Sequence, residues 1–503
     1  MKDQTIYEKL KTYCAGDSYP FHMPGHKRRL GGMGDPFTID ITEIDGFDNL
    51  HHPEGILKDA QERAAALYGA GEAFYLVNGS TAGILAAAAA ALSGGKATKG
   101  STKGSPDGSG PEILCARNVH KAVCHALYLN RARPVWLYPE MDGLLGEYGI
   151  CGRISPEQVR RALQEHPGVK AVLITSPTYD GVVSDVGAIA ETAHAAGIPL
   201  IVDQAHGAHF GLHPQLPENA ISLGADLVIT SLHKTLPSLT QTGLLLLSGN
   251  LISPGTLRRF LAVYQTSSPS YVLMAGMDEC VKMMNERGKD IYDQVLSCIR
   301  DFREEMKALH TIRLLPTDDP TRILISGGER LSGRAICDIL REQFHIEAEM
   351  ELPGYVLCLA GAGDDAEGFR RLGEALVQID AAIDAAAGDT GDMQGTRRLQ
   401  PEAESAEAQR LQAQMAKIFS SAPVSELPIH TAWDAGTQSV PLEESAGRIS
   451  ADFAYLYPPG MPIVIPGERI PPESAGLLAR AEKAGFGISG MEDLTGKRIR
   501  VVR

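Results

Sequence analysis

A lysine, a carboxylate, a hydroxyl and two imidazoles follow two apolar stretches of the sequence. The first stretch ends at Asp203, with His206 three residues further on, and the second leads to Ser231, with His233 and Lys234 just after it. Short apolar runs between polar or turn residues are typical of buried parallel strands. Open α/β sheets bind ligands beyond the carboxyl ends of their strands, so we expect these five side chains to share one site.

These residue types fit one cofactor well, pyridoxal 5'-phosphate (PLP). A partly desolvated lysine amine can form a Schiff base with its aldehyde, and a carboxylate can keep its ring nitrogen protonated. We therefore interpret Lys234 as the Schiff-base lysine and Asp203 as the partner of the ring nitrogen. The interval between them fits one βαβ crossover, which predicts neighbouring strands. His206 is predicted to hydrogen-bond Asp203 or the cofactor, and a purely structural histidine is the alternative.

A third group, Gly79-Ser80-Thr81, stands where a strand-like run gives way to an alanine-rich helical one. The N-terminus of a helix offers free backbone N–H groups and the positive end of a dipole, which suits a phosphate. Ser and Thr begin many helices, so this pattern alone is weak evidence. Together with the residues above, it predicts a phosphate site made by Ser80, Thr81, Ser231 and His233.

Three further groups of polar residues are weaker candidates. His120 follows another strand-like run, and its imidazole could stack on a flat ring, although a lone histidine there more often caps a helix. Hydroxyl-rich stretches at 176–181 and 266–271 could line the pocket or reach a phosphate, and an ordinary turn is the alternative for each. The pair His51-His52 has no matching set of Cys or carboxylate ligands, so no metal site is expected.

The elements that must position these residues alternate between strand-like and helical stretches from about residue 50 to 280. This alternation predicts a mostly parallel sheet with helices on both faces. The strands are expected at 73–77, 113–116, 134–137, 171–175, 200–202, 227–230 and 244–247, and the first helix at 54–68. A smaller α/β region follows from about residue 292, with strands expected at 312–315, 322–325 and 355–360.

The 503 residues are enough for several hydrophobic cores. The expected division is an N-terminal arm at 1–50, a PLP-binding major domain at 51–290, a small α/β domain at 291–385, a linker at 386–408 and a C-terminal domain at 409–503. The arm is dense in Gly, Pro, His and Asp, which favours an extended segment. A Gly/Ser/Lys-rich stretch at 94–110 is expected to be a surface loop.

Composition and charge narrow the classes of function. The formal net charge of −15 and the lack of a basic stripe argue against a nucleic-acid partner. The eight cysteines are scattered without a CxxC pair, which favours reduced thiols. No signal peptide and no apolar run long enough to cross a bilayer are recognisable, so we expect a cytoplasmic protein that does not enter the membrane.

Taken together, the motifs resemble those of the Orn/Lys/Arg decarboxylases, which are PLP enzymes of fold type I, the aspartate-aminotransferase-like fold. The resemblance extends over nearly the whole chain. The motifs that carry it are Pro24-Gly25-His26-Lys27, the stretch 50–55, Asn78-Gly79-Ser80-Thr81, Asn118-Val119-His120-Lys121, the stretch 178–181, Asp203-Gln204-Ala205-His206, Ser231-Leu232-His233-Lys234, and the stretches 457–460 and 465–468.

The resemblance implies a role for each site residue. Lys234 is then the PLP lysine, Asp203 the ring-nitrogen partner and His120 the residue that stacks on the ring. The residues around the phosphate are Ser80, Thr81, Ser231 and His233, with the stretch 266–270 contributed by a partner subunit. This implies a homodimer, or a higher homo-oligomer, with shared active sites. The chain resembles the shorter members of the family, which lack an N-terminal wing domain, and the 94–110 loop is expected to be a peripheral insertion.

The activity that the resemblance implies is α-decarboxylation of arginine, lysine or ornithine, which yields CO2 and agmatine or a diamine for polyamine biosynthesis. A buried substrate cation needs a carboxylate, and the candidates are Glu43, Asp45, Asp48, Glu54 and Asp180. One alternative is another fold type I enzyme, an aminotransferase or lyase, although no arginine to clamp a substrate carboxylate can be placed. The other is a catalytically silent regulatory homologue, which the intact Lys234 and Asp203 disfavour.

Overall fold

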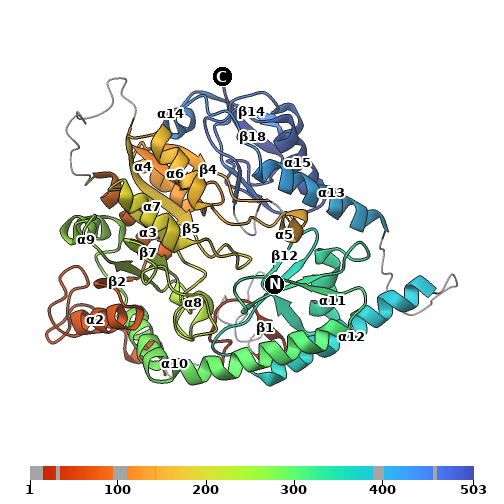
Figure 1. The fold of residues 1–503 in the computed structure, drawn as a ribbon, viewed down its shortest axis with the longest axis horizontal. Coiled ribbons are helices and arrows are strands. Elements are labelled where there is room, and N and C mark those ends of the chain that lie inside the picture. The colour runs from red at the N-terminus through yellow and green to blue at the C-terminus, as the bar shows by residue number, and fades with distance from the viewer. Residues whose placement is uncertain (1–14, 30–33, 94–109, 142, 389–401, 457–460) are drawn as a thin grey trace.

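The computed structural model describes residues 15–29, 34–93, 110–141, 143–388, 402–456 and 461–503 (Figure 1). Most of the expected surface loop at 94–110, much of the expected linker at 386–408 and the turn at 457–460 therefore lie outside the described residues. Within the described residues, no helix is long and apolar enough to span a membrane, and every cysteine is a free thiol.

A seven-stranded sheet forms the centre of the molecule. In spatial order, its strands are β2 (Glu72–Leu76), β8 (Gly243–Leu247), β7 (Leu227–Thr230), β6 (Leu200–Asp203), β5 (Val169–Thr175), β3 (Glu112–Ala116) and β4 (Arg133–Leu137). Each of the seven strands expected between residues 73 and 247 is present, with ends shifted by two residues at most. Only β8 runs antiparallel to its neighbours, because the short connection from β7 carries no crossover helix.

The strands that carry the expected site lie side by side. β6 and β7 pair in parallel, with Asp203 opposite Ile229, so Asp203 and the turn after β7 meet at one edge of the sheet. The predicted neighbouring strands are confirmed, but the predicted βαβ crossover is wrong, because the connection at 204–226 consists of turns and bends without a helix. The strands are built almost entirely from buried Val, Ile and Leu, as expected for a sheet that is covered on both faces.

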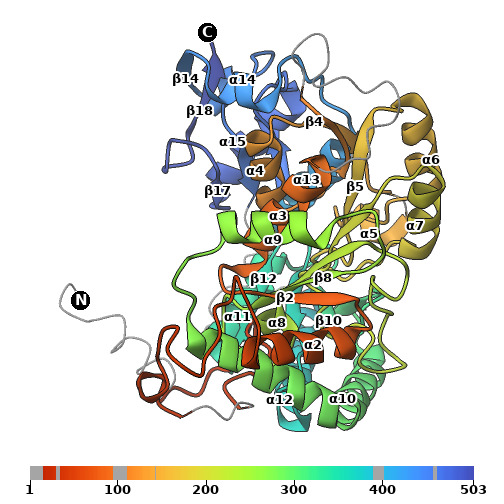
Figure 2. The same cartoon turned by 90° about the vertical axis from the view of Figure 1, so that its left-hand side faces the viewer.

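Helices cover both faces of this sheet, as the alternation predicted. Figure 2 shows α6 and α7 on one side of β5, and α3 and α4 on the other. The helices of this region are α2 (Ile56–Tyr68), α3 (Gly79–Ser93), α4 (Lys121–Leu129), α5 (Gly143–Glu147), α6 (Pro156–Glu165), α7 (Val186–Ala195), α8 (Leu232–Thr235) and α9 (Pro254–Tyr264). The alanine run of α3 is buried against the sheet, and its small side chains let the helix backbone approach closely.

A 35-residue helix, α10 (Tyr271–Glu305), runs along the base of the molecule from α2 to α12 (Figure 1). The boundary expected at residue 290 therefore falls inside one continuous helix. Beyond it lies a four-stranded antiparallel sheet in the order β12-β13-β10-β9. The elements here are β9 (Arg313–Leu315), β10 (Arg322–Ser326), α11 (Gly333–Phe344), β11 (Ile346–Ala348), β12 (Met350–Glu351), β13 (Val356–Leu359) and α12 (Ala366–Gly388).

Two ends of the chain complete the structure. The N-terminal strand β1 (Tyr19–Phe21) pairs in parallel with β11 in a separate two-stranded sheet, which attaches the arm to the small α/β region. The C-terminal region consists of α13 (Glu402–Phe419), α14 (Ile429–Trp433), β14 (Thr437–Pro441), β15 (Ala454–Leu456), β16 (Met461–Val464), α15 (Pro472–Lys483), β17 (Ile488–Ser489) and β18 (Arg498–Val502). Its apolar side chains share a core with the small sheet, in which Leu324 and Leu357 join Leu411 and Leu477.

Candidate active site

Lys234 lies on α8, the single helical turn that follows β7, and its side chain is only partly exposed to solvent. Its Nζ lies 2.7 Å from His206 Nε2. Burial lowers the pKa of Lys234 to about 8, against the opposing effects of the Asp203 and Glu349 charges. Burial also lowers the pKa of His206 far below its usual value, so its neutral ring accepts the hydrogen bond from the amine. The His206 ring bonds Lys234 rather than Asp203, and the other predicted partner, the cofactor, stays a prediction.

Asp203 ends β6 beside this pair. It is 3% exposed, and its Oδ1 accepts a hydrogen bond from the Ala205 N–H at 3.1 Å. Burial raises the pKa of the Asp203 carboxyl, and the positive charge of Lys234 opposes that shift. A buried carboxylate of this kind is stable when a cationic group lies next to it. The end of β6 therefore provides a position where a protonated ring nitrogen would be stabilised.

Two hydroxyls meet at the start of α3. The Ser80 and Ser231 Oγ atoms lie 2.6 Å apart, although one follows β2 and the other follows β7. Gly243 permits this approach, because a Cβ there would lie 2.8 Å from the Thr230 carbonyl oxygen and 3.2 Å from Ser80 Oγ. The structure thus brings together Ser80 and Ser231, as predicted, at the N-terminus of a 15-residue helix.

The other two residues predicted for the phosphate lie at the margin of this hydroxyl pair. His233 Nδ1 lies 2.9 Å from the Thr242 carbonyl oxygen, and burial lowers its pKa to about 4. Thr81 is exposed on the first turn of α3. The stretch beginning at Thr266 lies against the same chain's Asn78, whose Oδ1 accepts the Thr266 N–H at 3.0 Å.

His120 is the N-cap of α4, and its Nδ1 accepts the Ala122 N–H at 3.2 Å. Burial, followed by the charge of Lys234, lowers the pKa of His120 to about 3. The ring is therefore neutral and lies within electrostatic range of the amine. The alternative of a helix-capping histidine is therefore confirmed, while stacking on a ring stays a prediction.

Glu349, which follows β11, is the residue at this site that the sequence did not suggest. Its Oε1 accepts the Tyr179 hydroxyl at 2.5 Å, and its Oε2 accepts the Met23 N–H at 2.9 Å. The Tyr179 ring lies 4.3 Å from that of His206, centroid to centroid. This connects the Glu349 carboxylate, through Tyr179 and His206, to Lys234. No motif surrounds Glu349, and its distance along the chain from Lys234 hides the contact.

Two of the carboxylates expected to bind a substrate cation have structural partners instead. Asp48 Oδ2 accepts backbone N–H groups at the start of α2, from Gly55 at 2.7 Å and Leu57 at 3.0 Å. Asp180 accepts the Tyr355 hydroxyl at 2.5 Å, and burial raises its pKa to about 6.

The N-terminal arm passes directly over α8. The Gly25 N–H donates to the His233 carbonyl oxygen at 2.9 Å, and the Gly25 carbonyl oxygen accepts from Gly363 N–H at 3.0 Å. A Cβ on Gly25 would lie 2.4 Å from the Thr235 carbonyl carbon, so only glycine fits here. Two residues on, Lys27 Nζ donates to the carbonyl oxygens of His22 and Leu359, each at 2.8 Å, and lies 3.7 Å from Asp364.

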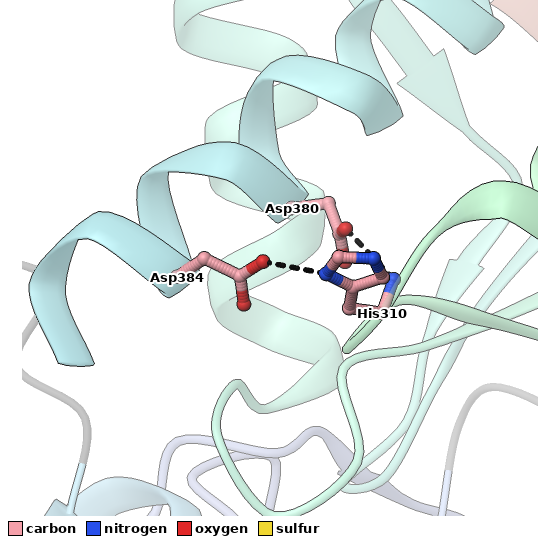
Figure 3. Close-up of side chains that lie close together, drawn as sticks. All are labelled: His310, Asp380 and Asp384. Atoms are coloured by element: carbon pink, nitrogen blue, oxygen red, sulfur yellow. Dashed lines mark hydrogen bonds and ion pairs between the residues drawn. The ribbon is translucent and has the colours of Figure 1, made fainter. Parts of the chain in front are cut away.

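One group of side chains outside this site has the proximity of metal ligands. Figure 3 shows Asp380 and Asp384, from α12, beside His310. Asp384 Oδ2 lies 3.0 Å from His310 Nδ1, while the Asp380 carboxylate accepts three backbone N–H groups, from residues 310 to 312. These hydrogen bonds engage both Asp380 oxygens, so we assign the group to attaching the segment before β9 to α12.

Two models of one protein family match the chain. The family model described as Orn/Lys/Arg decarboxylase, major domain, matches residues 4–327. The model for the C-terminal domain of the same decarboxylases matches residues 412–483.

Among curated relatives, the arginine decarboxylase of Bacillus subtilis is 33% identical over 518 aligned residues, which cover 99% of this chain and 97% of that protein. Among solved structures, the lysine decarboxylase LdcF of Francisella novicida has a TM-score of 0.72 at 22% identity, covering 91% of this chain and 73% of that one. A structure of SPT with PLP has a TM-score of 0.50 at 14% identity and covers 65% of this chain and 77% of that one.

Proposed function

Because the chain belongs to the Orn/Lys/Arg decarboxylase family and is a decarboxylase of a basic amino acid, we propose that it binds PLP on Lys234 and that arginine is its substrate. Its fold is the expected aspartate-aminotransferase-like fold, with a smaller α/β unit and a C-terminal unit. The observation that carries the PLP proposal is the half-buried Lys234, whose amine contacts a neutral imidazole beside a buried carboxylate.

The described residues fit PLP at each of its functional groups. Asp203 would stabilise the protonated ring nitrogen, His120 would lie on the ring face, and Lys234 would bind the aldehyde carbon. The phosphate would be held at the start of α3 by Ser80, Thr81, Ser231 and His233. Within the described residues, His206 Nδ1, Asn118 Oδ1 and Thr230 Oγ1 are buried without a hydrogen-bond partner, as expected of a site that is built to hold a further group.

When bound, PLP supplies an electron sink for the pair of electrons left as CO2 departs. The chain's own residues supply the rest. Asp203 would keep a proton on the ring nitrogen, and the arm, which bonds His233 next to Lys234, limits the access of water to that side. Lys234 Nζ and His206 Nε2 are hydrogen-bonded at 2.7 Å. This pair is therefore our candidate for returning a proton to the substrate's α-carbon.

The substrate's guanidinium is proposed to bind Glu349. A carboxylate accepts the planar fork of a guanidinium through two parallel hydrogen bonds, which is a geometry that an ammonium cannot reproduce. Glu349 acts electrostatically on Lys234, so a charge at that position is felt at the reacting end of the pocket. The relative with 33% identity is an arginine decarboxylase, and this supports arginine over lysine.

We also propose a cytoplasmic homodimer with shared active sites. The arm leaves apolar side chains unusually exposed, which favours a covered surface. They are Phe37, which is 87% exposed, together with Ile39, Ile44 and Phe47. Light scattering should give the mass of a dimer, and Phe37→Ser with Phe47→Ser should shift the population towards the monomer.

The deciding experiment is an absorbance spectrum of the purified protein, followed by CO2 release from arginine, lysine and ornithine in parallel. A band near about 420 nm that Lys234→Ala abolishes, with CO2 from arginine alone, supports both parts of the proposal. Lys58→Ala, which changes an exposed lysine, should leave both readouts unchanged. A protein that stays colourless after incubation with PLP rejects the cofactor proposal, and CO2 from lysine alone rejects the proposed substrate.

Glu349→Gln tests the substrate contact separately. It should raise KM for arginine by roughly tenfold or more, as expected when a hydrogen-bonded charge pair is broken, and change kcat much less. Glu351→Gln is the matched control, because Glu351 lies two residues further on and pairs with Arg334 outside the site. Equal KM values for the two variants would remove Glu349 from the substrate pocket.

A further inference from the structure

The helix that begins at His120 is packed against the C-terminal region. Along α4, the Tyr128 hydroxyl donates to Asp434 at 3.0 Å, and its ring lies 4.7 Å from that of Trp433. The His125 ring lies 6.1 Å from the rings of both Trp433 and Phe453. Residues more than 300 positions away in the sequence therefore fix one face of the helix whose first turn faces Lys234.

A buried ion pair joins the same two regions just before that helix. Arg117 Nη2 lies 3.1 Å from Glu468 Oε2, and Arg117 Nη1 donates to the Pro462 carbonyl oxygen at 3.0 Å. The two side chains are only 5% and 3% exposed. Glu468 Oε2 also accepts the Ile465 N–H at 2.9 Å, so the carboxylate is held in place by its own loop.

Burying such a pair costs free energy, because two charges leave water and their attraction seldom repays it. The pair instead fixes the orientation of the two side chains, because a guanidinium and a carboxylate fit each other in few orientations. Arg117 lies three residues before His120. The Arg117 N–H donates to the Leu137 carbonyl oxygen at 2.7 Å, and Val119, between the two residues, is fully buried. The turn is thus anchored at Arg117 by the C-terminal region and at His120 by its own helix cap.

We propose that Glu468 is a positioning residue, which acts through Arg117 to set the position of the His120 ring over the site. The C-terminal region then takes part in holding the cofactor without touching it. This inference rests on the proposed function for its first readout, PLP binding, but it also predicts a property of the protein without PLP.

The first test is the affinity of the apoprotein for PLP, measured by titrating absorbance near about 420 nm. Glu468→Gln should weaken binding roughly tenfold, the size of effect typical of partners that orient a ligand-holding side chain. Glu426→Gln is the matched control, because Glu426 pairs with Arg469 at 2.6 Å in the same region but at the surface. It should bind PLP as the unchanged protein does. Equal affinity in Glu468→Gln would overturn the proposal.

The second test needs no PLP. Diethyl pyrocarbonate acylates accessible neutral imidazoles, and mass spectrometry locates the modified histidine. In the apoprotein, Glu468→Gln should speed labelling of His120 several-fold while labelling of the more exposed His166 stays constant. If the protein proves not to bind PLP at all, the proposed function fails, and this labelling still decides whether Glu468 positions His120.

A double variant separates positioning from general stability. Arg117→Met with Glu468→Met removes both charges and keeps apolar volume, which can preserve or raise stability. Our proposal expects this variant to melt near the temperature of the unchanged protein and still bind PLP weakly. Recovery of full PLP affinity in the double variant would show that the ion pair serves only stability, and the proposal would be wrong.

Discussion

Two lysines lie on adjacent turns of this molecule, Lys27 buried and Lys234 half-buried, and their surroundings differ in kind. Lys27, on the arm, donates to two carbonyl oxygens and lies beside the Asp364 carboxylate. Lys234, on α8, has one side-chain hydrogen bond within the part of the chain that the structure describes, and it goes to the neutral ring of His206. A Gly25–His233 backbone hydrogen bond joins the two turns directly.

The difference lies in what each environment does with the charge. Burial lowers the pKa of both amines, and at Lys27 the Asp364 charge opposes the shift from 3.7 Å. Carbonyl oxygens can only accept, so they hold Lys27 as a donor. An imidazole can also give a proton, so His206 leaves the Lys234 amine able to react. Burial alone therefore does not determine whether a lysine is structural or reactive. The hydrogen-bond acceptors around the amine determine it.

The largest expected effect is on activity, at Lys234. Lys234→Met should lower kcat by roughly 10³- to 10⁶-fold, the scale seen when a group that bonds covalently to the substrate or cofactor is removed. The same change should alter the stability of the apoprotein at pH 7 less than Lys27→Met does, because removal of a partly buried charge offsets the loss of the cation next to Asp203. Steady-state CO2 release and urea unfolding measure the two effects. Substantial residual activity would show that another amine can take its place.

Lys27→Met should have the opposite profile. It leaves the Asp364 carboxylate and two carbonyl oxygens buried without their cation, and breaking a buried pair in this way costs about 3–5 kcal/mol of unfolding free energy. Urea unfolding measures the loss, and the folded fraction should still take up PLP. A loss of PLP uptake without a loss of stability would contradict the distinction drawn between the two lysines.

The two lysine variants should also differ in how the free energy of unfolding depends on pH. The pKa of Lys234 is about 8 in the folded apoprotein and about 10.5 when exposed, so between these values the unfolded chain binds more protons. The free energy of unfolding should therefore rise with pH across this window, by an amount on the order of 3 kcal/mol, with the cost of burial present in full below it. The difference between the unchanged protein and Lys234→Met isolates this contribution, and a constant difference from pH 7 to 10.5 would contradict it.

The smallest change in the free energy of unfolding is expected for an ion pair at the surface. Arg63 and Asp278 form a two-point ion pair at 2.7 Å, but they are partly exposed to water. Arg63→Met should cost less than about 1 kcal/mol, because water and salt screen exposed charges. Thermal melts at low and high salt would measure this. A cost as large as that of Lys27→Met would mean that burial is not what distinguishes the ion pairs here.

Much of the site followed from the sequence because its residues sit at the ends of strands in a single sheet. Apolar runs located β6 and β7, and the polar residues after them located Asp203 and Lys234. The predicted pairing of these strands and the meeting of Ser80 with Ser231 are both found. Such features need only local patterns and one rule of topology.

Two residues whose roles the sequence does not predict are brought to the site by other layers of the fold. Glu349 arrives from the small sheet and Glu468 from the C-terminal region, each far along the chain from its partner. Neither stands at the end of a predicted strand of the central sheet. A lone glutamate in a sequence is most often a solvated surface charge, and only packing between layers makes these two exceptional.

The turn around Gly25 also imposes an order on how the protein can be made. It is synthesised well before its hydrogen-bond partners, His233 and Gly363, which leave the ribosome far later. The arm can therefore dock only after the small sheet has formed against the central one. A ribosome stalled before residue 363, or a chain truncated there, would carry Lys234 and Asp203 on a finished sheet but an open site, so assembly of the site is expected to be among the last events of folding.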